Sequence, residues 1–167
     1  MGSIIVPIFL AMMPGSFVFG WAKPVPVNPR NFRDPVGGDI RVSMAGIVSN
    51  LILAVICTLF LAILQGLGSK IGFGGLIGIL SQAAWFGIYI NLILAFFNLI
   101  PIPPLDGSHV VYHLLPLELR DRYRQFGRYG IGVIMLLLFV VPDGFRLLMW
   151  PVTYLADLAL AFAGLWV

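Results

Sequence analysis

The chain has few charged side chains. Only 10% of its 167 residues are Asp, Glu, Lys or Arg, whereas soluble domains carry about 25%. Hydrophobic residues make up 60% of the chain, and the mean hydropathy is +1.01. This excludes an ordinary soluble domain and predicts an integral membrane protein. The basic residues are spread along the chain and form no cluster, which argues against nucleic acid as a partner.

Cysteine and histidine are also scarce. Cys57 is the sole cysteine, which excludes an internal disulfide, and its apolar surroundings predict a packing role. The two histidines, His109 and His113, have the i, i+4 spacing of the zinc motif H-E-x-x-H. Val110 stands where that motif has glutamate, so the general base is missing. A zinc site made by Asp106, His109 and His113 is therefore disfavoured against two histidines that have local partners.

The sequence contains several long runs of residues without a charged side chain. A membrane helix needs about 20 apolar residues, and the runs predict an all-α polytopic membrane protein with about four to five transmembrane helices in one domain, 1–167. The expected segments are 3–19, interrupted by prolines, then 42–65 and 76–100. Residues 145–167 predict either a last span or an interfacial helix. Asn91, inside the third segment, is expected to bond to another helix.

Three segments read as loops. Residues 22–41 contain four prolines and two adjacent glycines, which argues against a long helix. Residues 66–75 are a glycine-rich turn, and 116–128 form a basic loop before the last hydrophobic segments. The positive-inside rule places 22–41 and 116–128 together on the cytoplasmic side. The alternating residues from Lys23 to Asn28 suit either an extended strand edge or a rigid connector.

The most informative stretch is 98–107, Asn-Leu-Ile-Pro-Ile-Pro-Pro-Leu-Asp-Gly. Its three prolines lack backbone donors and prevent the preceding helix from continuing. Asp106, at the broken end of a membrane helix, is costly unless it handles a cation, a metal or a proton. The amide of Asn98 can donate to a developing oxyanion. Because the sequence has no phosphate loop, no Ser-His-Asp set and no C-x-x-C, this pair is the candidate site.

In this stretch the sequence resembles the site-2 protease family of intramembrane zinc metalloproteases, in its prokaryotic compact-core branch. Residues 98–107 match that family's N-x-x-P-x-P-x-L-D-G signature. Residues 19–33 match the loop that follows its metal-binding helix, and Ala45-Gly46 with Ser49-Asn50 resembles its A-G-P-x-x-N element, with Ile47 in place of the proline. The resemblance covers about 1–115, whereas 116–167 agrees only in hydropathy.

The resemblance implies a function. Asp106 would be a ligand of a catalytic Zn²⁺, and Asn98 would hold the scissile carbonyl or its oxyanion. The substrate would be a transmembrane protein, cleaved within the lipid bilayer of a bacterial or archaeal cell membrane. The segment beside the substrate would consist of Lys23, Pro24, Val25, Pro26, Val27 and Asn28.

The sequence also departs from the family pattern. The family's H-E-x-x-H helix, which supplies two zinc ligands and the general base, lies upstream of the matched region and is not in this chain. We therefore expect an amino-terminally truncated gene product, in preference to a degenerate inactive member. Two non-catalytic alternatives stay open: a pseudoprotease that binds client helices, and a transporter-like protein. Transporters often contain internal repeats, whereas the 98–107 element occurs once.

Overall fold

The computed structural model describes residues 33–71, 75–139 and 143–164. The chain divides into two units, Met1–Pro35 and Val36–Val167, and the second contains the helices from Val36 onward. Within the described ranges the regular structure is helical and includes no strand, which confirms the all-α prediction. The elements are α2 (Pro35–Ile71), α3 (Leu76–Asn98), α4 (Gly107–Leu114), α5 (Leu117–Phe126), a short 3₁₀ helix η2 (Gly127–Tyr129), α6 (Gly130–Phe139) and α7 (Gly144–Gly164).

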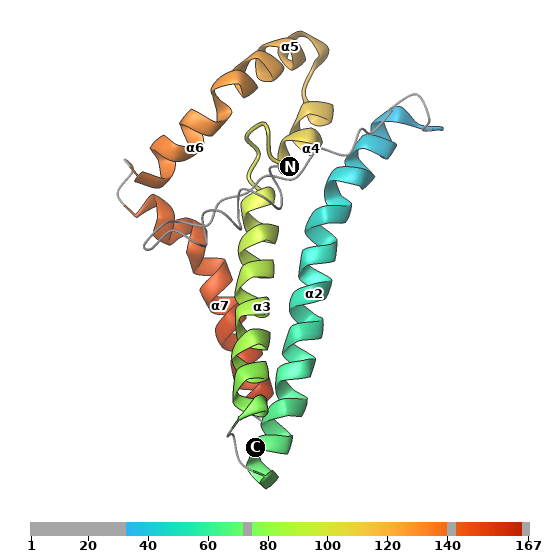
Figure 1. The fold of residues 1–167 in the computed structure, drawn as a ribbon. Helices are drawn as coiled ribbons and strands as arrows, with labels where there is room; N and C mark the ends of the chain where they lie inside the picture. The colour runs from blue at the N-terminus through green and yellow to red at the C-terminus, as the bar shows by residue number, and fades with distance from the viewer. Residues whose placement is uncertain (1–32, 72–74, 140–142, 165–167) are drawn as a thin grey trace, which may run out of the picture. The chain divides into compact units, whose positions relative to one another are not determined.

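Three of the described helices are long and apolar enough to cross a membrane. They are α2, α3 and α7, the last through Arg146–Gly164, and Figure 1 shows α7 running beside α3. The ten residues of α6 span only about 15 Å, too little for a hydrocarbon core of about 30 Å. The expected segment 3–19 lies outside the described residues. The structure is that of a polytopic membrane protein whose last segment can span.

Helix α2 is longer at both ends than the predicted segment 42–65. The prediction of a loop up to residue 41 is wrong, because Pro35 occupies the first helical turn, where its missing N–H costs nothing. Arg41 supports this turn by donating from Nε to the Gly37 carbonyl at 3.1 Å. The helix also runs through Gly66 and ends at Ile71, inside the predicted turn. At 1.5 Å per residue its 37 residues cover about 55 Å, so α2 extends beyond the hydrocarbon core.

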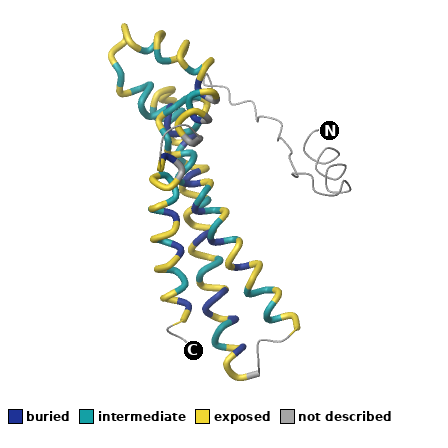
Figure 2. The backbone as a smooth tube through the Cα atoms, turned by 90° about the vertical axis from the view of Figure 1, so that its left-hand side faces the viewer, coloured by how far each residue is buried: buried dark blue, intermediate teal, exposed yellow. Residues whose placement is uncertain are grey.

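The core of the bundle is built largely from small side chains. Figure 2 shows buried positions recurring along the long helices where they face one another, with exposed positions on their outer sides. Alanine dominates the buried cluster, which permits close approach between helices in lipid. Its members are Ala54, Leu61 and Ala62 from α2, Ala84, Ile88 and Leu92 from α3, and Val152, Ala156 and Ala163 from α7.

One turn of α3 contains the polar residue Asn91 and, at Gly87, a close contact with α2. The Asn91 side chain donates from Nδ2 to the Gly87 carbonyl of its own helix at 2.8 Å, so the bond that the structure describes is not the predicted interhelical one. Gly87 itself faces α2, where a Cβ added to it would lie 2.7 Å from Cys57 Sγ. Cys57 is a free thiol that packs against the core, which confirms its predicted packing role.

The substitution Gly87→Ala is expected to lower the free energy of unfolding by about 1–3 kcal/mol, the usual cost of overpacking a tight interface. Shortening the opposing side chain removes the clash, so the double variant Gly87→Ala/Cys57→Ala is expected to recover most of the loss. Thermal unfolding in detergent, followed by circular dichroism, measures both effects. Equal stability of the single and double variants would contradict the assignment of this contact.

Candidate functional site

A compact loop follows the end of α3. Its backbone closes on itself through hydrogen bonds from the Ile102 amide to the Ile100 carbonyl at 2.9 Å and from the Leu105 amide to the Ile102 carbonyl at 3.0 Å. The helix stops at Asn98, just before the prolines, and restarts as α4 at Gly107. The predicted Pro-broken helix that carries Leu-Asp-Gly is therefore confirmed.

The basic segment after α4 packs on this loop. The Tyr123 hydroxyl of α5 donates to the Pro101 carbonyl at 2.9 Å. Burial raises the pKa of Tyr123, and a hydrogen bond with Ser108 lowers it by less. The backbone comes closest at Gly130, where an added Cβ would lie 1.6 Å from the Pro103 carbonyl oxygen. The α5–α6 segment thus packs on the proline loop through both Pro101 and Pro103.

Helix α5 also braces α4. The Arg120 guanidinium donates to two carbonyl groups at the end of α4, those of His113 at 2.9 Å and Leu115 at 3.0 Å. Such donors satisfy the free carbonyls that end a helix. The guanidinium groups of Arg120 and Arg124 lie 5.5 and 4.9 Å from the centre of the Tyr112 ring, within the range of cation–π attraction.

Asp106 begins α4 without capping it. An aspartate at this position usually accepts a hydrogen bond from the helix backbone, but the Asp106 carboxylate makes no such bond. Its Oδ2 faces α2, where a Cβ added to Gly46 would lie 3.3 Å away. Burial raises the pKa of the Asp106 carboxyl, and the charge of His109 opposes this shift. The carboxylate is thus half-buried and available to a ligand.

The turn after Asp106 returns to the end of α3. A Cβ added to Gly107 would lie 2.3 Å from the Leu99 carbonyl oxygen, so this backbone approach requires glycine. Leu99 follows Asn98, the half-buried last residue of α3. The structure thereby brings the segments of both predicted site residues, Asn98 and Asp106, to one turn. The predicted substrate segment, Lys23 to Asn28, lies outside the described residues.

The two histidines share one carboxylate. His109 Nδ1 and His113 Nε2 lie 3.0 and 2.8 Å from Oδ2 of Asp39, in the first turns of α2. Both histidines have a partner, but the prediction that the partners are local is wrong, because Asp39 is 70 and 74 residues away along the chain. Sequence reasoning missed Asp39. No local pattern signalled it, because Asp39 is 70 residues from His109 and 74 from His113 along the chain.

No group of three or more His, Cys, Asp and Glu side chains within the described ranges is arranged to hold a metal ion. The disfavoured zinc site of Asp106, His109 and His113 is therefore not formed here, since the histidines turn to Asp39. Asp106 fits a metal as a single ligand, because its carboxylate makes no capping hydrogen bond and its Oδ2 faces a glycine.

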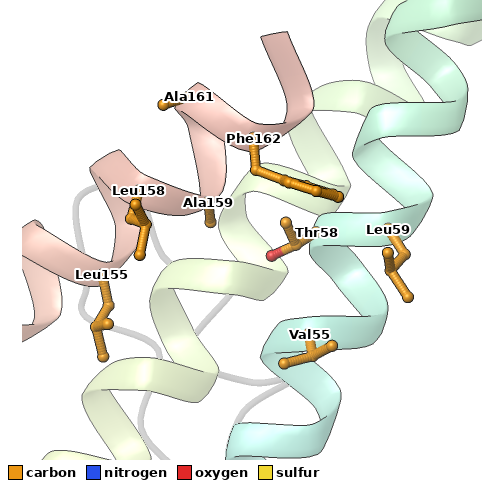
Figure 3. A pocket seen from close by; sticks show the side chains of 8 residues that line it. All are labelled: Val55, Thr58, Leu59, Leu155, Leu158, Ala159, Ala161 and Phe162. Atoms are coloured by element: carbon orange, nitrogen blue, oxygen red, sulfur yellow. The ribbon is translucent and has the colours of Figure 1, made fainter. Parts of the chain in front are cut away.

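A separate groove between α2 and α7 is lined mainly by apolar side chains. Figure 3 shows its lining side chains, which are apolar except for Thr58. The Thr58 hydroxyl is already used, since it donates to the Ala54 carbonyl at 2.8 Å. The groove therefore offers hydrocarbon contact and no reactive group. Its lining consists of Val55, Thr58, Leu59, Leu155, Leu158, Ala159, Ala161 and Phe162.

Comparison with known proteins decides the family. A family model described as "Peptidase family M50" matches residues 27–141. The chain belongs to this family. M50 is the site-2 protease family, so the resemblance stated from the sequence is confirmed. The matched range includes α5 and α6, the segments that pack on the proline loop.

A curated relative supports the M50 assignment. The chain is 42% identical over 133 residues to the protein named "Putative zinc metalloprotease YwhC" of Bacillus subtilis (strain 168). The alignment covers 80% of this chain and 59% of that relative, so the chain spans less than two thirds of its length. No solved structure matches this M50 chain.

Proposed function

We propose that this M50 member acts as a zinc-dependent endopeptidase that cleaves membrane-embedded proteins, with Asp106 as one ligand of the metal. The observation that carries the proposal is the Asp106 carboxylate. It stands at a broken helix end, makes no capping hydrogen bond and faces Gly46 on the neighbouring helix. An acid in that setting is stabilised by a cation.

The residues of the chain have distinct parts in this proposal. Bound zinc supplies Lewis-acid chemistry and lowers the pKa of a coordinated water. Asp106 would hold the metal through its carboxylate, which faces Gly46, where the missing side chain leaves room. Asn98 donates its amide N–H to the carbonyl oxygen of the peptide bond under attack, which stabilises the charge that develops there. A catalytic zinc usually has three protein ligands, of which the described residues supply this one.

The substrate is proposed to be a transmembrane helix that lies against Lys23–Asn28 and exposes one peptide bond. The contact of Asp39 with α4 supports a common side for the start of α2 and the basic helix α5. Basic segments favour the cytoplasmic side. We therefore propose that residues 22–41 and 116–128 lie in the cytoplasm and that Asp106 lies near that side of the cell membrane.

The test uses the complete gene product, including any residues encoded upstream of Met1, purified in detergent. We expect about one zinc per chain, a normal content for a catalytic site. Asp106→Ala is expected to reduce the zinc content to near zero and to lower cleavage of a transmembrane substrate by at least about 100-fold, since it removes a metal ligand. Metal analysis and a gel-based cleavage assay measure these changes.

Asp121→Ala is the matched control, because it removes an exposed carboxylate from α5. It should leave zinc content and cleavage unchanged. Full zinc content in Asp106→Ala would overturn the ligand assignment. Binding of client helices without cleavage by the zinc-loaded native protein would instead favour a non-catalytic member.

A further inference from the structure

A polar cluster joins the start of α2 to α4. Oδ2 of Asp39 lies 3.0 Å from His109 Nδ1 and 2.8 Å from His113 Nε2. The two histidines stand one turn apart on α4, so a single carboxylate oxygen is bonded to two successive turns of that helix. Hydrogen bonds to an ionised acceptor are stronger and shorter than those between neutral groups.

The cluster is partly withdrawn from water. The exposed fractions of the side chains are 29% for Asp39, 44% for His109 and 12% for His113. The partners assign an N–H to Nδ1 of His109 and to Nε2 of His113, each donating to Asp39. Nδ1 of His113 is buried without a partner among the described residues, and a lone pair there costs less than an unpaired N–H. Asp39 therefore fixes the orientation of both rings.

This cluster and the Asp106 contact belong to one interface. Asp39 and Gly46 lie two turns apart on one face of α2, while His109 and Asp106 lie one turn apart at the start of α4. Oδ2 of Asp106 lies beside Gly46, an exposed residue of α2, since a Cβ added there would be 3.3 Å away. An eight-residue helix is too short to be stable alone. Because no capping bond holds the carboxylate, its position depends on where α4 is fixed.

We propose that Asp39 is a positioning residue for Asp106, acting through His109 and His113; the proposal rests on the proposed role of Asp106 as a metal ligand. Asp39 touches neither the metal nor the substrate. It fixes α4 against α2, and thereby presents the Asp106 carboxylate beside Gly46. Partners that orient ligands commonly change metal affinity 10–100-fold when removed.

Disulfide trapping tests the position of residue 106 without any metal. In a Cys57→Ala background, cysteines replace Gly46 and Asp106, a pair chosen because a Cβ at 46 would be 3.3 Å from Oδ2 of Asp106. Mild oxidation of the full chain is expected to give a high fraction of internal disulfide, measured by gel mobility after proteolytic nicking. Adding Asp39→Ala should reduce this disulfide fraction to the level found for two cysteines that are far apart in the fold.

Two further variants separate positioning from general damage. Asp39→Asn keeps one carbonyl acceptor and should restore part of the cross-linking. This variant tests the same contact if the alanine variant folds poorly. In a chain that carries His109→Asn and His113→Asn, adding Asp39→Ala should change nothing more, because its partners are gone. Asp121→Ala, on the exposed surface of α5, should leave cross-linking intact.

The metal readout links the cluster to the ligand. In the complete gene product, Asp39→Ala is expected to weaken zinc binding 10–100-fold and to lower kcat with little change in KM, whereas Asp121→Ala changes neither. Cross-linking that survives Asp39→Ala overturns the inference whatever the metal does. Lost cross-linking with unchanged zinc affinity overturns it too. Zinc retained by Asp106→Ala, with cross-linking still dependent on Asp39, would overturn the ligand role alone.

Discussion

Gly130→Ala is expected to lower the free energy of unfolding by more than about 3 kcal/mol, the upper end of overpacking effects. The reason is direct, since the new Cβ would lie 1.6 Å from the Pro103 carbonyl oxygen. Two backbones meet there, so neither can yield by a rotamer change. The α5–α6 segment must then separate from the proline loop. Denaturant unfolding of the detergent-solubilised chain measures the loss.

Gly132→Ala provides a matched control in the same helix. No heavy atom lies within 4 Å of a Cβ added at this exposed position. Alanine has a higher helix propensity than glycine, so this variant should gain up to about 1 kcal/mol. Similar stability of the two variants would show that α6 does not pack on the loop as described.

Gly107→Ala is expected to affect the site more directly. The added Cβ would lie 2.3 Å from the Leu99 carbonyl oxygen and 2.7 Å from its carbon. Relieving this clash moves the start of α4 away from the end of α3, and the Asp106 carboxylate moves with it. We expect a loss of about 2–3 kcal/mol in stability and a fall of at least about tenfold in zinc affinity, since a ligand is displaced.

Competition with a fluorescent zinc chelator measures the affinity of the Gly107 variant. Gly164→Ala is its control, because a Cβ at the end of α7 meets nothing within 4 Å. Normal zinc affinity in Gly107→Ala, together with reduced stability, would mean that Asp106 reaches its ligand without this close turn.

The local features of the site were predictable from the sequence because their causes are local. Three prolines after Asn98 must end a helix, and the structure ends α3 there. An acid after that break is costly in any membrane fold, which singled out Asp106. The course of α2 was not predictable in the same way. Pro35 and the glycines after it resemble a loop, whereas the contacts of Asp39 with α4 favour a helix.

Contacts between segments far apart in the chain could not be predicted from the sequence. Asp39 and His113 are 74 residues apart, and no local pattern indicates their pairing. The same holds for Gly130 and Pro103, whose approach depends on how the basic helix α5 turns back over the loop. Spacing alone suggested a zinc pair for His109 and His113, but in the structure both rings bond to the Asp39 carboxylate of another helix.

The proposed function depends on metal binding by Asp106. The most direct measurement is the absorption spectrum of the complete gene product loaded with Co²⁺, in a Cys57→Ala background that carries Asp106→Cys. A thiolate in place of the carboxylate is a good ligand for such a metal, so we expect a new sulfur-to-cobalt charge-transfer band in the near ultraviolet. The control Asp121→Cys, with its thiol on the exposed face of α5, should show none. Cobalt bound at full stoichiometry without that band in Asp106→Cys would contradict the claim.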